Sequence, residues 1–91
     1  MKIVLNKCYG GFSFSAKACE ALGLKSRYTI IARNDERLIS LMEEYGSEWV
    51  SGDLAALVLV DIPDNCTDWE MDEYDGWERI TYVVDGMLYH A

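Results

Sequence analysis

Apolar positions follow two spacings along this chain, and the spacing separates strands from helices. A continuous apolar centre within residues 2–8 predicts a first strand. Small apolar residues over 16–22 predict a short helix, because Ser13 or Ser15 can cap its start and a glycine ends it. The N-terminal part of the chain therefore begins with a strand and then a helix.

A longer helix is predicted between a capping residue, Asn34 or Asp35, and Gly46. Its apolar residues recur at i, i+3, i+4 and i+7, which is the spacing of one helix face. These residues are Leu38, Leu41, Met42 and Tyr45.

The segments around this helix are less regular. Residues 27–32 are β-branched and aromatic, which favours a second strand or an extended connector. Residues 47–53 read as a loop around Trp49. The apolar run 54–62 has the length of a buried strand and is ended by a proline, although its first residues also suit a helical turn.

Two Asp-Gly pairs, at 75–76 and 85–86, each predict a two-residue hairpin turn. Counting outward from both turns gives one three-stranded meander, in which Asp72 faces Arg79 as an ion pair and Glu73 faces Glu78 as a like-charge pair. One face of the meander is apolar, and we expect helices to pack on it. That face consists of Trp69, Met71, Ile80, Tyr82, Val84, Met87 and Tyr89.

Together these elements predict one α+β domain that spans residues 1–91. We expect an antiparallel sheet of four to five strands that ends in the three-stranded meander, with two helices packed on one side. At this length the chain can bury one modest core.

Charge is unevenly distributed along the chain, whose formal net charge is −8. Residues 61–91 carry nine acids and one base, whereas residues 1–37 carry seven bases and three acids. An acidic surface repels nucleic acid and anionic lipid, so we expect neither to be a direct partner. No apolar segment approaches the ~20 residues of a membrane span, and a signal peptide is not evident, so the chain reads as cytoplasmic.

The chain contains four short strings, Cys8-Tyr9-Gly10-Gly11-Phe12, Arg33-Asn34-Asp35, Ile62-Pro63-Asp64 and Glu73-Tyr74-Asp75-Gly76. Together they resemble a family of small uncharacterised proteins of tailed phages and prophages. The resemblance covers nearly the whole chain, in the same order. It implies a phage accessory protein that acts in the cytosol of the bacterial host, where small acidic proteins often inhibit a host or defence component.

The acidic part of the meander is the first candidate site, because aromatic residues lie among its carboxylates and aromatics anchor protein interfaces. We hypothesise that it binds and inhibits a host or defence protein. The spacing of the acids does not match a metal loop, so a metal is not expected. The predicted protein-binding residues are Glu70, Asp72, Glu73, Tyr74, Asp75, Trp77 and Glu78.

The alternative hypothesis is a binding site for a small anionic ligand, such as a signalling nucleotide, at the Gly-Gly loop and nearby arginines. Ordinary turn formation and helix capping explain the same residues. Arg27 and Arg37 lie in the same basic part of the chain. The predicted ligand-binding residues are Tyr9, Gly10, Gly11, Ser13, Arg33, Asn34 and Asp35.

Catalysis ranks below both. His90 and a cysteine could pair as base and nucleophile, but no third, orienting residue is identifiable. The three cysteines, Cys8, Cys19 and Cys66, are widely spaced and read as reduced thiols. We therefore predict a non-enzymatic protein without a cofactor, and leave a homodimer open.

Overall fold

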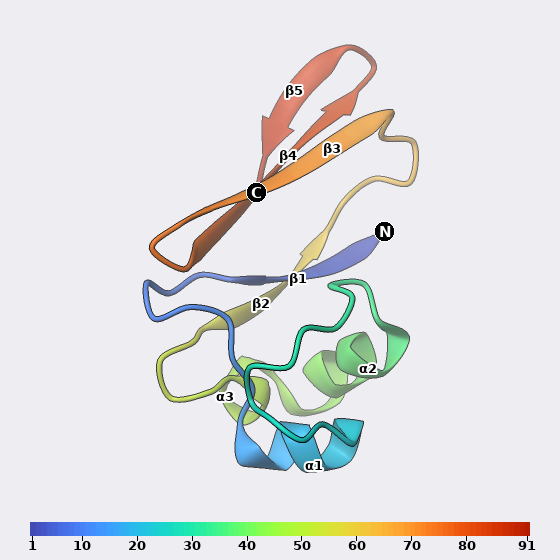
Figure 1. The fold of residues 1–91 in the computed structure, drawn as a ribbon. Coiled ribbons are helices and arrows are strands. Elements are labelled where there is room, and N and C mark those ends of the chain that lie inside the picture. Colours follow the sequence, from blue (N-terminus) through green and yellow to red (C-terminus); the bar gives the residue numbers. More distant parts are fainter.

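The computed structural model describes all 91 residues and arranges them in three layers (Figure 1). Helices form one outer layer, a two-stranded sheet forms the middle and a three-stranded meander forms the other outer layer. The elements are β1 (Lys2–Asn6), α1 (Ala16–Leu22), α2 (Glu36–Tyr45), α3 (Ser47–Val50), β2 (Leu57–Asp61), β3 (Asp68–Tyr74), β4 (Trp77–Val84) and β5 (Met87–His90).

The middle sheet is apolar on both faces because both faces are covered. β1 and β2 pair antiparallel, with Ile3 opposite Val60 and Leu5 opposite Val58. Alternate side chains point to opposite faces, so Val4 joins the core under the helices while Ile3 and Leu5 join the core under the meander. This two-sided burial explains the continuous apolar runs in the sequence.

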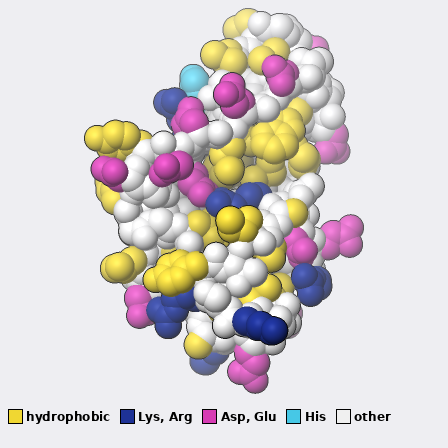
Figure 2. Space-filling model, in the orientation of Figure 1, with side chains coloured by type: hydrophobic (Ala, Val, Ile, Leu, Met, Phe, Trp, Pro, Cys, Tyr) yellow, Lys and Arg dark blue, Asp and Glu magenta, His cyan; other side chains and the backbone are white.

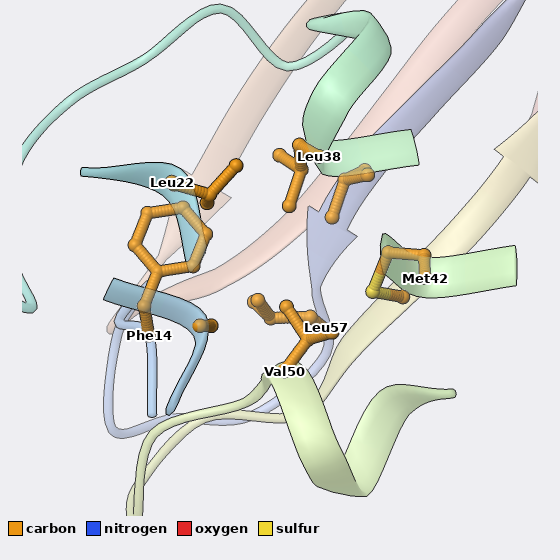
Figure 3. Close-up of a cluster of buried hydrophobic side chains, with 8 residues drawn as sticks. Phe14, Leu22, Leu38, Met42, Val50 and Leu57 are labelled. Carbon is orange, nitrogen blue, oxygen red and sulfur yellow. The ribbon is translucent and has the colours of Figure 1, made fainter. Parts of the chain in front are cut away.

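The larger core lies between the middle sheet and the helices, and Figure 3 shows side chains from all three helices converging there. Phe14 is fully buried in this core and lies just before α1. The buried members are Val4, Phe14, Ala18, Leu22, Leu38, Met42, Val50 and Leu57.

Both predicted helices are confirmed with their caps. The Ser15 side chain accepts a hydrogen bond from the Ala18 amide at 3.0 Å, and α1 ends at Gly23 in the left-handed region, with φ of 70°. Asp35 caps α2 by accepting bonds from two first-turn amides. The predicted loop over 47–53 was wrong, because its first four residues form α3.

The meander has the predicted register throughout, with Trp69 opposite Tyr82 and Val84 opposite Met87. Both turns have the positive φ values that the mirror-image hairpin turn requires: 50° and 90° at Asp75 and Gly76, and 51° and 76° at Asp85 and Gly86.

The α+β class is confirmed, but the five strands form two sheets rather than one. The expectation that helices cover the apolar face of the meander was wrong, because the helices lie on the far side of the middle sheet (Figure 1). Only Ile80 is fully buried on that face, against Ile3, Leu5 and Ile62. Residues 27–32 form a connector without strand structure. None of the helices is long and apolar enough to cross a membrane.

Candidate functional site

A buried polar cluster joins the meander to the middle sheet beside the Ile80 core, and we call it the junction. It consists of Asn6, Arg33, Gly76 and Glu78. Asn6 ends β1 and is fully buried. Its side-chain Nδ2 donates to the carbonyls of Cys8 at 2.8 Å and Gly76 at 2.7 Å, and its Oδ1 accepts from the Ala56 amide at 2.9 Å. The Asn6 side chain therefore links the end of β1, the residue before β2 and the 75–76 turn.

Glu78 is the buried charge of the junction, with 6% of its surface exposed. The Arg33 guanidinium binds its carboxylate in a bidentate manner, with Nη2 donating to Oε2 at 2.7 Å and Nη1 donating to Oε1. The Asn6 backbone amide also donates to Oε1 at 2.8 Å. Because these donors occupy the carboxylate, the expectation that Glu78 lies on a partner-binding surface was wrong.

The same ion pair resolves the like-charge contact between Glu73 and Glu78. Each carboxylate has its own donor, since Glu73 accepts a hydrogen bond from the Gly76 amide at 2.7 Å while Glu78 is bound by Arg33. The guanidinium carbon of Arg33 also lies 3.8 Å from the centre of the Phe12 ring. A cation over an aromatic face is stabilised there, so Phe12 holds the arginine in position.

The glycine-rich loop contacts the first hairpin turn directly. A Cβ added to Gly76 would lie 2.4 Å from the Gly11 nitrogen, which is too short for a Cβ contact, so only glycine fits at this position. Beside this contact the rings of Tyr9 and Trp77 lie 5.2 Å apart between centroids. Residues of three segments, 8–12, 33–35 and 73–76, thus meet at or beside the junction, where Arg33 and Gly76 help to dock the meander.

The structure does not assemble the predicted anion pocket. A shallow depression beside the loop is lined by Tyr9, Gly10, Gly11, Asp75 and Gly76, and its one charged side chain is acidic. Arg33, expected to supply positive charge, is neutralised by Glu78. The loop therefore has no free cation with which to bind an anion.

The remaining residues of that prediction serve the local fold. Ser13 is buried, and its carbonyl accepts from the Gly52 amide at 3.0 Å. Asn34 is exposed, and Asp35 caps α2. Desolvation alone would raise the pKa of Asp35, but bonds from the Leu38 and Arg37 amides and the nearby Arg37 guanidinium outweigh it and lower that pKa.

The exposed acids of the predicted protein-binding surface are divided between the two faces of the meander. Alternation along β3 directs Glu70, Asp72 and Tyr74 to the outer face of the meander, away from the middle sheet. Asp72 forms the predicted cross-strand ion pair with Arg79 at 3.2 Å, and both side chains are more than half exposed. Asp75 is exposed at the turn, and Glu73 lies on the opposite face but remains exposed.

Sequence reasoning missed the inner face as a surface. Trp69 is 46% exposed and Met71 is also exposed, and both line a mainly apolar groove of about 260 Å³ between the meander and residues 32–34. Figure 2 shows hydrophobic side chains in the hollow between the meander, at the top, and the rest of the molecule. The sequence signal for this exposed face was the continuous apolar run of β1. A strand that is apolar on both faces packs between two layers, so the helices cover the middle sheet and not the meander.

The groups considered for catalysis are dispersed. His90 Nδ1 lies 3.1 Å from the Thr81 hydroxyl, and the three cysteines are free and half-buried in other parts of the fold. No group of three or more His, Cys, Asp or Glu side chains is arranged to hold a metal ion.

Comparison with family models, with curated proteins and with solved structures found no match to this chain. The candidate sites therefore rest on the residues and their geometry.

Proposed function

We propose that this protein is a non-enzymatic binding protein that captures and inhibits a cytosolic protein of a bacterial host or its defence system through the meander. The supporting observation is the concentration of exposed large apolar side chains there. The meander holds 23 of the 91 residues but seven of the twelve such side chains. They are Trp69, Met71, Tyr74, Trp77, Met87, Leu88 and Tyr89.

Exposed apolar side chains at this density favour an interaction surface, because single-chain proteins rarely leave large apolar areas open to water. Tyr74, at 74% exposure, projects from the end of β3. Trp77 packs on Tyr9, which restricts its ring. A restrained aromatic side chain loses little entropy on binding, and aromatics are frequent hot spots.

The charges around these aromatics indicate the kind of partner. Glu70, Asp72 and Asp75 are all exposed and acidic, whereas Arg79 already pairs with Asp72. Such a surface speeds the association of a basic protein and disfavours an acidic one. A nucleic-acid-binding protein has this basic character, which supports a partner whose own ligand is polyanionic.

The junction supports the proposal because it makes the surface rigid. The ion pair of Arg33 and Glu78, the Asn6 side chain and the Gly76 contact all hold the meander to the middle sheet. A preorganised surface avoids the entropic cost of ordering on binding.

The test compares two sets of neutral substitutions in affinity capture from a bacterial lysate, followed by titration with the purified captured protein. One triple variant carries Glu70→Gln, Asp72→Asn and Asp75→Asn in the meander. The matched control removes the same number of exposed acids from the helical layer, by Glu36→Gln, Glu44→Gln and Glu48→Gln.

We expect the meander variant to weaken binding and to abolish inhibition of the partner, while the control variant retains both. The loss should resemble the effect of high salt on the wild-type protein, because screening acts on the same charges. Equal binding by both variants would refute the meander as the binding surface.

A further inference from the structure

The first strand of the meander, β3, has one free edge. It pairs only with β4, no other element packs against it, and all seven of its residues are exposed. The residues that flank a two-residue hairpin turn, here Tyr74 and Trp77, form a hydrogen-bonded pair. Because such pairs alternate with non-bonded ones, the amides of Trp69, Met71 and Glu73 point away from β4, toward the free edge.

The side chains of this edge exclude a second copy of the same strand. Asp68, Glu70 and Asp72 occupy every second position on the outer face. Two such strands side by side would bring carboxylates against carboxylates, which is how natural proteins protect an edge from pairing with itself. A strand with lysine or arginine at every second position would form attractive cross-strand pairs instead.

The inner face of the same strand requires apolar partners. Trp69 and Met71 line the groove of about 260 Å³, whose other walls include Ile3 and Ala32. A strand added at the free edge of β3 would place alternate side chains beside Trp69 and Met71 at this groove. Apolar side chains there would remove both from water.

We propose that β3 accepts a strand from a partner protein by edge addition, and that this strand alternates basic with apolar residues. The basic residues face Asp68, Glu70 and Asp72, and the apolar ones cover Trp69 and Met71. Main-chain hydrogen bonds to the free edge supply affinity, and the alternating side chains supply specificity. This inference rests on the proposed function and adds the binding mode and partner chemistry.

A pair of synthetic peptides tests it on the full chain. The probe is Lys-Val-Lys-Val-Lys-Val-Lys, and the control has the same composition with its lysines and valines in separate blocks. We expect the alternating peptide to bind about tenfold tighter than its isomer, since several cross-strand pairs add together. In ¹⁵N-resolved NMR spectra its perturbations should centre on the amides of Trp69, Met71 and Glu73. Equal binding of the two peptides, or perturbations away from β3, would overturn the inference.

N-methylation of the peptide separates strand addition from simple charge attraction. Only every second amide of a strand faces the neighbouring strand. Methylating either the valine amides or the lysine amides should therefore abolish binding, while methylating the other set should not. Sensitivity at the valines would indicate an antiparallel strand, because they then share hydrogen-bonded pairs with Trp69 and Met71, and sensitivity at the lysines would indicate a parallel one. An equal effect at both parities would contradict edge addition.

Substitutions in the protein provide the last control. Glu70→Gln should weaken binding of the alternating peptide, whereas Glu44→Gln, at an exposed position of α2, should not. If these peptides fail but the meander triple variant still loses its lysate partner, the edge-addition inference is wrong and the proposed function stands. If the meander triple variant keeps its lysate partner, the proposed function is wrong, whatever the peptides show.

Discussion

Breaking the buried ion pair of the junction is the sharpest test of how the meander is held. Arg33→Met keeps most of the aliphatic stem but leaves the Glu78 carboxylate with the Asn6 amide as its remaining donor. Glu78→Leu leaves the Arg33 guanidinium without its carboxylate. The double variant removes both charges and places apolar side chains between Phe12 and the middle sheet.

The magnitudes follow from burial. Removing one member of a buried pair leaves an uncompensated charge and costs about 3 to 5 kcal/mol. Glu78→Leu should lie near the lower value, because 23% of the Arg33 side chain is exposed and its charge can reach water. The double variant should cost only about 1 to 3 kcal/mol, which is the cost of leaving the Asn6 amide unpaired. A domain of this size has about 5 to 14 kcal/mol of stability, so either single change is large.

Urea unfolding followed by circular dichroism and by tryptophan fluorescence measures these costs. Two of the three tryptophans, Trp69 and Trp77, report on the meander, and Trp49 reports on the helical layer. The exposed pair of Asp72 and Arg79 gives the control cycle, where each single change should cost less than about 1 kcal/mol. Single variants at the junction that cost no more than those of the control, or a double variant equal to their sum, would refute the reasoning.

Three further predictions concern single substitutions, and the first two compare matched positions. Gly76→Ala and Gly86→Ala both force alanine into positive φ, which costs about 1 to 2 kcal/mol of stability. Only the alanine at position 76 also meets the Gly11 backbone, so Gly76→Ala should cost about 1 to 3 kcal/mol more than Gly86→Ala in urea unfolding. Fully buried Ile80→Ala should cost about 2 to 5 kcal/mol, whereas exposed Met71→Ala, on the same face, should cost less than about 1 kcal/mol, and equal losses would contradict the exposure of that face. Asp35→Ala should cost about 1 kcal/mol at neutral pH. Because folding lowers the pKa of Asp35, the stability that its carboxylate contributes is present above the unfolded pKa of about 3.9 and is lost as pH falls through the folded pKa. The thermal unfolding midpoints of the variant and the wild type should therefore converge in acid. A difference between them that stays constant with pH would contradict the cap.

The hairpins and helix caps were predictable because neighbouring residues decide them. An aspartate and a glycine at positive φ, here 51° and 76° at Asp85 and Gly86, produce the same tight turn wherever it occurs in a fold. The turn sets the register, so the pairing of Asp72 with Arg79 followed from counting. Asp35 likewise bonds amides two and three residues ahead.

The candidate site was less predictable because its main contact joins distant residues. Arg33 and Glu78 are 45 residues apart. Their chemical types suggested a surface acid and a free cation, and the sequence contains no local signal that they would meet. Their ion pair buries the Glu78 carboxylate, so Glu78 does not lie on the interaction surface, and it neutralises Arg33, so Arg33 does not supply positive charge to an anion pocket.

The sequence by itself determined the α+β class, the ends of α1 and α2 and every register of the meander, since short-range sterics and hydrogen bonding set these. Only the tertiary structure decided which surface the helices cover. Burial of apolar area is non-directional, so an apolar face can be covered equally well by a helix or by a strand pair. Here β1 and β2 lie between the helices and the meander, and Trp69 and Met71 remain at the surface as a consequence.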